Sequence, residues 1–147
     1  MNYTKHDKKT LPINRQQLYD NVFGVKGTVD TVVRRLLTSL GFKSKLLGTQ
    51  YLKDAILYRY DNIDSLQVGM TTRAYVVVAN TYNSTSTRVE RAIRNSILNC
   101  YTYGALKAFN ELAQAPVIDS KFPPSNGEFM CSVVNLLQLE IQSAETV

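Results

Sequence analysis

Apolar residues recur at helical spacing along most of the chain. Between residues 28 and 40 they repeat every three or four positions, as Val29, Val32, Val33, Leu36, Leu37 and Leu40, and Gly41 then marks a stop. A capping box, Ser125-Asn126-Gly127-Glu128, opens the last helix. The predicted helices lie at residues 28–40, 50–60, 72–82, 86–100, 105–114 and after 125 as far as 141, with shorter pieces near 16–22 and 65–68. The pattern therefore predicts an all-α fold, a compact bundle of about six helices.

Two segments depart from this pattern. The run Tyr75-Val76-Val77-Val78 is rich in β-branched residues, so a buried strand is the alternative there. Residues 1–27 mix Lys and Arg with Asn, Gln, Pro and Gly, which is typical of a poorly packed terminus. We therefore expect a flexible basic N-terminal arm over residues 1–27 and a helical domain over residues 28–147.

Composition and charge narrow the class of partner. The 147 residues are 44% hydrophobic and 20% charged, as expected of one globular domain. The formal net charge of +5 is uneven, because residues 1–103 hold fifteen Lys and Arg against seven acids, whereas residues 104–147 hold two against five. A basic portion of this kind favours a polyanion such as nucleic acid, and a merely solvated surface is the alternative.

Other classes lack support in the sequence. The longest apolar run, Ala74–Ala79, is far too short to span a bilayer, and the N-terminus lacks a signal peptide, so we expect a cytoplasmic protein without a membrane partner. The single histidine, His6, lies in the arm, and we expect no enzyme activity, metal or cofactor. Cys100 and Cys131 fall on apolar helical faces and are expected to be reduced core residues. Tyrosines such as Tyr103 are assigned to core and rim packing rather than to a stacking surface.

The helix predicted for residues 86–100 separates its apolar from its polar side chains. On a helical wheel of about 100° per residue, one face holds Val89, Ala92, Ile93, Ser96 and Cys100, with Ile97 at the margin. The opposite face carries Arg88, Glu90, Arg91, Arg94 and Asn95. A turn at residues 83–85 separates this helix from the one before it. The two helices and their turn form a predicted helix-turn-helix.

The residue types on the polar face suit the edges of bases in the DNA major groove. A guanidinium donates two hydrogen bonds to guanine, a carboxylate accepts one from cytosine, and an Asn side chain pairs with adenine or binds a phosphate. The alternative is an ordinary surface helix with a Glu90–Arg94 pair. Three arginines with almost no lysine favour DNA, because Arg suits bidentate recognition.

Residues 87–94, Thr-Arg-Val-Glu-Arg-Ala-Ile-Arg, carry a family resemblance. They resemble the recognition helix of the sporulation master response regulator of endospore-forming bacteria, the stage 0 sporulation protein A family. Residues 48–56, 60–63 and 125–129 match as well, and the resemblance covers about residues 31–141. It implies an all-helical C-terminal effector domain that binds promoter DNA, often as tandem copies on adjacent boxes. It also implies a contact with the RNA polymerase sigma factor.

The resemblance further implies roles for single residues. The positions that match base readers of a TGTCGAA-type box are Arg88, Glu90 and Arg91. Those that match contacts with the phosphate backbone are Thr85, Ser86, Thr87 and Asn95, the last in place of the usual histidine. As further backbone contacts we expect Arg94, Lys43, Lys45 and Arg73.

These expectations combine into one prediction with one rival. Full-length members of the family begin with a receiver domain, and the first ~30 residues here are too few for such a fold. We predict an effector domain without a receiver that regulates transcription by sequence-specific binding to double-stranded DNA, with a homodimer on tandem boxes as a further expectation. The alternative is a receiver-less interaction module that modulates the full-length regulator or RNA polymerase without a specific DNA site of its own.

Overall fold

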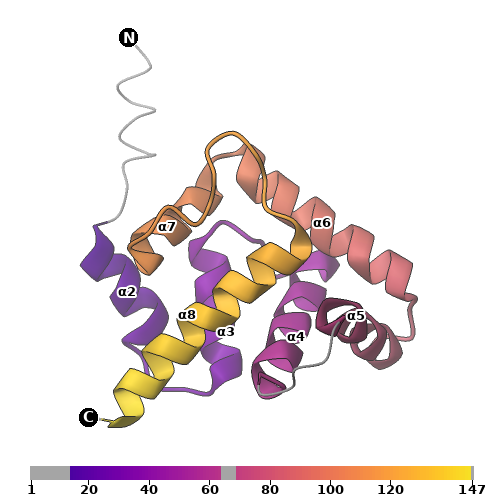
Figure 1. Cartoon of the computed structure of the whole chain (residues 1–147), viewed down its shortest axis with the longest axis horizontal. Helices are drawn as coiled ribbons and strands as arrows, with labels where there is room; N and C mark the ends of the chain where they lie inside the picture. The colour runs from indigo at the N-terminus through magenta and orange to yellow at the C-terminus, as the bar shows by residue number, and fades with distance from the viewer. Residues whose placement is uncertain (1–13, 64–68, 147) are drawn as a thin grey trace.

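Every regular element in the described part of the chain is a helix (Figure 1). The computed structural model describes residues 14–63 and 69–146. In chain order the elements are α2 (Arg15–Phe23), α3 (Val29–Ser39), α4 (Leu47–Asp61), α5 (Met70–Thr81), α6 (Ser86–Thr102), the 3-10 turn η1 (Ala105–Lys107), α7 (Ala108–Ala113) and α8 (Asn126–Thr146). The all-α prediction is confirmed. The short helical piece expected at residues 65–68 and His6 lie outside the described residues.

Helix boundaries follow capping signals that are visible in the sequence. Thr28 caps α3, because its hydroxyl oxygen accepts a hydrogen bond from the Thr31 N–H at 3.3 Å. After α3, Gly41 adopts φ +93°, a left-handed conformation that glycine reaches without strain. At the start of α8, the Ser125 N–H donates to Glu128 Oε1 at 2.9 Å and the Glu128 N–H donates to Ser125 Oγ at 3.1 Å. The predicted capping box is thus present, and its bonds to Ser125 lower the pKa of Glu128.

The strand alternative for residues 75–78 is wrong, because the segment lies within α5. The side chains of this region that are buried are Ala74, Tyr75, Val78 and Ala79, whereas Val76 and Val77 are exposed. Burial of adjacent pairs four residues apart is the period of a helix with one buried face. Packing against the rest of the bundle has outweighed the β propensity of the valines.

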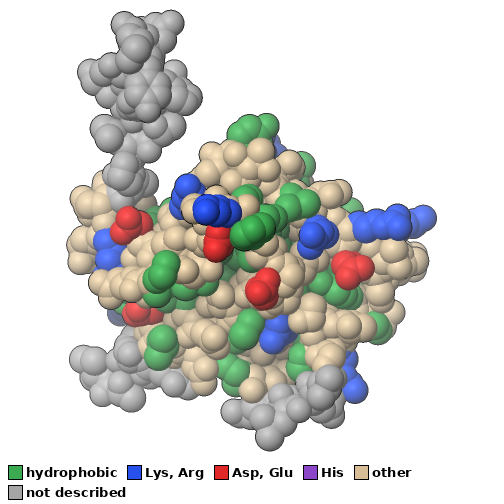
Figure 2. Space-filling view, turned by 45° about the horizontal axis from the view of Figure 1, so that its top comes forward, with side chains coloured by type: hydrophobic (Ala, Val, Ile, Leu, Met, Phe, Trp, Pro, Cys, Tyr) green, Lys and Arg blue, Asp and Glu red, His purple; other side chains and the backbone are tan. Residues whose placement is uncertain are grey.

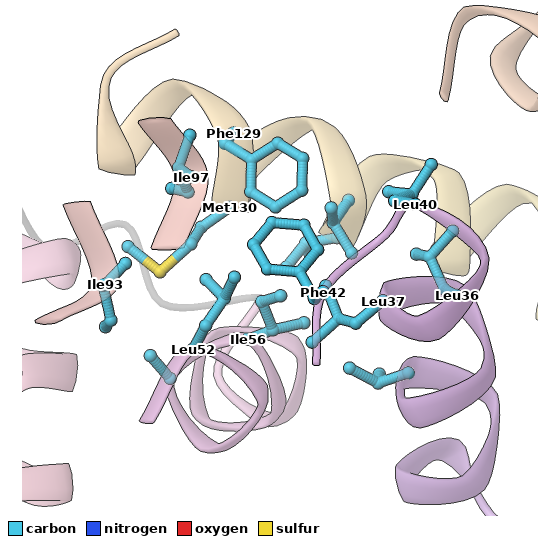
Figure 3. Close-up of a cluster of buried hydrophobic side chains, with 14 of the residues drawn as sticks. Leu36, Leu37, Leu40, Phe42, Leu52, Ile56, Ile93, Ile97, Phe129 and Met130 are labelled. Carbon is cyan, nitrogen blue, oxygen red and sulfur yellow. The ribbon is translucent and has the colours of Figure 1, made fainter. Parts of the chain in front are cut away.

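The hydrophobic core lies where α3, α4, α6 and α8 meet (Figure 3). In Figure 1, α8 crosses diagonally in front of α3 and reaches α6 with its first turns. In this core the Phe42 and Phe129 rings lie 5.7 Å apart, centroid to centroid. Ile93 and Ile97 enter it from α6 and are fully buried. Because burial of each such side chain contributes roughly 1.5–3 kcal/mol, this face holds α6 firmly in the bundle.

Helix α2 joins part of the expected N-terminal arm to the domain. Its Leu18 and Val22 are buried against the bundle. Arg15 Nε donates to the Glu111 carbonyl of α7 at 3.1 Å, and the Tyr19 hydroxyl donates to Glu140 Oε2 of α8 at 2.8 Å. The sequence analysis puts the boundary of the helical domain at residue 28, and α2, which precedes that boundary, contacts α3 and α7. Residues 1–13 of the expected arm lie outside the described residues.

Two expectations about packing are wrong, that Cys131 is a core residue and that Tyr103 packs in the core or at its rim. Cys100 is buried as expected, and burial raises the pKa of its thiol to about 11. Cys131 is exposed, because it points away from the face of α8 that carries the buried Phe129 and Met130. Tyr103, at the end of α6, is 86% exposed and packs against little of the bundle. In the described ranges no helix is long and apolar enough to cross a membrane.

Candidate nucleic-acid interface

A tight turn joins α5 to α6. Asn83 adopts φ +55°, and the Ser84 N–H donates to the Ala79 carbonyl at 2.8 Å, which ends α5. Thr85 then caps α6, because its hydroxyl oxygen accepts from the Arg88 N–H at 3.2 Å. Two helices with so short a turn form the helix-turn-helix that the sequence predicts. In Figure 1, α5 and the start of α6 lie together at the right of the molecule.

Helix α6 is held by one face and presents the other to solvent. The buried face consists of Val89, Ile93, Ile97 and Cys100. Ile97, which the helical wheel put at the margin, is only 1% exposed. The predicted reading face consists of Arg88, Glu90, Arg91, Arg94 and Asn95, and all five are exposed. The wheel therefore separated the two faces correctly.

The arginines of this face form no ion pair with a carboxylate in the part of the chain that the structure describes. Among the described residues, the ion pairs join Arg34 and Lys53 to Asp30, and Lys53 to Asp54, and none involves α6. The Glu90–Arg94 pair of the surface-helix alternative is not among them. Figure 2 shows Lys and Arg side chains projecting at the right-hand edge, the side on which Figure 1 places the start of α6. These guanidinium groups are therefore available to a ligand.

The backbone contacts that we expect outside the reading face lie at three places. Thr85, Ser86 and Thr87 form its N-terminus, where unpaired N–H groups and the helix dipole favour an anion. Lys43 and Lys45 are exposed in the loop before α4, and Lys43 lines a cavity of about 200 Å³ beside the C-terminal half of α6. Arg73 is exposed near the start of α5. The structure brings Lys43 close to the far end of α6 rather than to its first turn.

Close packing of α4 on α6 depends on a glycine. A Cβ atom built on Gly48 would lie 2.3 Å from Ser96 Oγ and 2.6 Å from the Ala92 carbonyl oxygen. Both distances are shorter than real Cβ contacts, so only glycine permits this approach. Sequence reasoning missed this role, because nothing local to Gly48 reveals which helix it will meet.

A tyrosine at the end of α5 anchors the turn to α4. The Tyr82 hydroxyl donates to Asp54 Oδ2 at 2.6 Å, and the Tyr82 ring meets Tyr51 edge-on at 5.0 Å. The hydrogen bond to Asp54, aided by partial burial, raises the pKa of Tyr82 to about 12. The hydrogen bond between Tyr82 and Asp54 thus attaches the turn before α6 to α4. Sequence reasoning did not identify this contact.

A second polar contact joins α8 to both helices of the motif. The side-chain amide of Asn126 donates to the Tyr75 hydroxyl at 3.1 Å and to the Glu90 carbonyl at 3.2 Å. Arg59 of α4 donates to Thr71 Oγ1 of α5 and to the Gly127 carbonyl of α8. Within the described ranges, no group of three His, Cys, Asp or Glu side chains gathers as metal ligands would. The side chains exposed on the polar face of α6 are charged or able to form hydrogen bonds.

The geometry defines a class of protein, a helix-turn-helix protein with a positively charged second helix suited to nucleic acid. The comparison with known families agrees with that class. The family described as sporulation initiation factor Spo0A C terminal matches residues 33–137, a range that includes the whole of α4, α5 and α6. The chain belongs to this family, whose members are DNA-binding effector domains of response regulators that control transcription in sporulation.

Proposed function

We propose that this protein regulates transcription by inserting α6 into the major groove of a TGTCGAA-type box in double-stranded DNA. One observation carries the proposal. The arginines on the exposed face of α6 are accessible to solvent and form no ion pair with any described residue. A guanidinium without an internal partner can donate both of its parallel N–H groups to guanine O6 and N7 without first breaking a contact within the protein.

Each residue of the interface has a role that its chemistry suits. Arg88 and Arg91 read guanines, and the Glu90 carboxylate accepts a hydrogen bond from a cytosine amino group. We assign the contacts with the phosphate backbone to residues on or next to the first half of α6 and to three basic residues on other segments, which are Thr85, Ser86, Thr87, Arg94, Asn95, Lys43, Lys45 and Arg73. Contacts with phosphates place the helix in the groove and make the affinity depend on salt, whereas the base contacts supply specificity.

The test is a fluorescence anisotropy titration of the full chain against two labelled duplexes of equal length. One duplex contains a TGTCGAA box, and the other contains the same bases in scrambled order. We expect tighter binding to the intact box, a preference that persists as salt is raised. Equal affinity for both duplexes would leave only non-specific binding, and no binding at low salt would overturn the proposal.

A second function, contact with other proteins, has its own observation. Val117 and Phe122 are exposed in the segment between α7 and α8, Phe122 to 70%. An exposed aromatic ring suits a protein partner, such as the RNA polymerase sigma factor. A second copy of this chain, bound to an adjacent box, is a further candidate partner. The alternative function is that of an interaction module, in which this chain acts on the full-length regulator without a specific DNA site of its own. Titration of one-box and two-box duplexes, with and without sigma factor, separates these options by complex size.

A further inference from the structure

Asn126 occupies an unusual place for a polar side chain. It stands at the start of α8 and is only 6% exposed, one of two buried polar residues in the described part of the chain. Its amide nitrogen donates both of its N–H groups, one to Tyr75 of α5 and one to the backbone of α6. Its Oδ1 atom has no hydrogen-bond partner among the described residues. A buried amide is costly unless it is satisfied, so an amide kept with one end unsatisfied needs an explanation.

The group on α6 that accepts the hydrogen bond from Asn126 is the Glu90 carbonyl. The Glu90 carbonyl belongs to the peptide group that joins Glu90 to Arg91, two of the three proposed base readers. Within the helix that carbonyl already accepts from the Arg94 N–H, and a carbonyl oxygen has a second lone pair, which Asn126 occupies. A rotated amide would bring Oδ1 against this carbonyl oxygen, so the two bonds fix the orientation of the side chain.

The base of this contact is itself held in place. Ser125 and Glu128 cap the first turn of α8, and Arg59 donates to the Gly127 carbonyl at 3.4 Å. Phe129, three residues on, is fully buried in the core. Asn126 therefore projects from a turn that several hydrogen bonds hold in place. Its amide binds the peptide between Glu90 and Arg91 and so fixes the position of that peptide relative to the turn.

We infer that Asn126 is a positioning residue for sequence recognition, which sets the placement of the Glu90–Arg91 peptide relative to the DNA bases. The inference rests on the proposed function and extends it to a residue that does not reach the DNA. A displaced base-reading side chain loses the bidentate geometry on which discrimination depends, whereas phosphate contacts tolerate such a shift. Loss of the Asn126 amide therefore lowers specificity more than it lowers overall affinity.

The experiment compares Asn126→Ala and the isosteric Asn126→Asp with wild type on the intact and scrambled duplexes. The matched control is Asn135→Ala, which removes an exposed Asn side chain from the same helix. Measurements are made at a temperature where circular dichroism shows every variant to be folded. We expect the ratio of affinities for the intact and scrambled boxes to fall about tenfold in both Asn126 variants, the effect typical of one lost base contact, and to stay unchanged in Asn135→Ala. An unchanged ratio in folded Asn126 variants overturns the inference.

Two further measurements keep the inference testable. Tyr75→Phe removes only the hydroxyl that orients the amide, so a smaller fall of the ratio in the same direction is expected even if the Asn126 variants do not fold. An unchanged ratio in folded Tyr75→Phe overturns the inference. Amide hydrogen exchange at Arg94, without DNA, reports the Glu90 carbonyl directly, and we expect faster exchange in Asn126→Ala. If wild type itself shows no preference for the box, the proposed function fails, whereas the exchange result still decides whether Asn126 holds this peptide.

Discussion

Arg88 and Arg91 differ in their surroundings from Arg15, Arg34 and Arg59. Arg15 and Arg59 donate to backbone carbonyls of neighbouring helices, and Arg34 pairs with Asp30 at 2.6 Å. Those side chains are occupied by the fold. The arginines of α6 contact no carboxylate of the described chain, which is why we assign recognition to them rather than to the sum of the positive charge.

The first prediction concerns Arg91. Arg91→Ala should weaken binding to the intact box by about 1–3 kcal/mol and change binding to the scrambled duplex much less, because a bidentate contact with guanine discriminates between bases. The control is Lys107→Ala, which removes one exposed positive charge in η1, beyond the far end of α6. Anisotropy titrations measure both. Equal losses on the two duplexes would make Arg91 a phosphate contact.

A second prediction concerns the alkaline stability of the turn. Tyr82 keeps its proton in the folded state, where its pKa is about 12, and has a reference value of 10.0. A raised folded pKa stabilises the protein below the unfolded pKa, and that contribution is lost as pH rises from about 10 through about 12. Tyr82→Phe should cost about 1 kcal/mol of unfolding free energy at neutral pH, and the gap from wild type should narrow over this range.

Urea denaturation at pH 8 and at pH 11.5 measures the gap for Tyr82. Tyr103→Phe is the control, since its ring is exposed at the end of α6. We expect that variant to follow wild type at both values of pH. A gap for Tyr82→Phe that stays constant across the range would show that the Asp54 contact does not control ionisation of the phenol.

At the scale of elements, the position of α6 depends on how closely α4 approaches it. Gly48 meets both a side chain and the backbone of α6, and the backbone cannot rotate away as a side chain can. The α4–α6 contact and the core side chains Ile93 and Ile97 therefore act together. Separation of these helices would move the whole recognition face, whatever the chemistry of its residues.

The third prediction tests this contact. Gly48→Ala should lower the free energy of unfolding by about 1–3 kcal/mol, because it overpacks a tight contact. The double variant Gly48→Ala/Ser96→Ala should recover only part of the loss, since the Ala92 carbonyl oxygen still obstructs the Cβ atom. Gly127→Ala is the control, because its Cβ would meet only the Thr71 side chain, at 3.3 Å from Oγ1, and no backbone atom. Denaturation midpoints decide, and full recovery in the double variant would contradict the role of the backbone.

At the scale of the whole molecule, positive charge is placed around the motif while the C-terminal portion is acidic. Arg73, Lys43 and Lys45 are exposed on segments that flank α6, and residues 104–147 hold five acids against two Lys. Such an arrangement orients the domain as it approaches a polyanion. It also separates two kinds of proposed contact. The contacts of α6 with bases depend on the DNA sequence, whereas the contacts of the flanking lysines with phosphates do not.

The fourth prediction uses that separation. Lys43→Ala/Lys45→Ala should reduce the slope of log affinity against log salt by about two, because each phosphate contact contributes roughly 0.9 to that slope. The ratio of affinities for the intact and scrambled boxes should remain that of wild type. Titrations at four salt concentrations measure both quantities, with Lys107→Ala as the comparison at an exposed lysine outside the proposed interface. A wild-type slope in the double variant would remove these lysines from the interface.

Much of this architecture was predictable because its signals are local. Helical periodicity predicted α3, α4 and α6, and the capping box of Ser125 and Glu128 predicted the start of α8. The same periodicity separated the buried face of α6 from its arginines, since neighbours on a helix are three or four residues apart in sequence. At residues 75–78, local propensity and packing disagree, and the sequence therefore allowed either a helix or a strand. Burial of Tyr75 and Val78 on one face favours the helix.

The sequence by itself determined an all-helical, basic chain with a helix-turn-helix and a face of arginines. Only the tertiary structure decided that Gly48 lies against Ser96, that Tyr82 donates to Asp54, and that Asn126 holds the Glu90 carbonyl. Each of these contacts joins residues 28 or more positions apart, so no periodicity or cap encodes it locally. They arise when several helices bury their apolar faces at once, and that packing brings distant polar groups within hydrogen-bond distance.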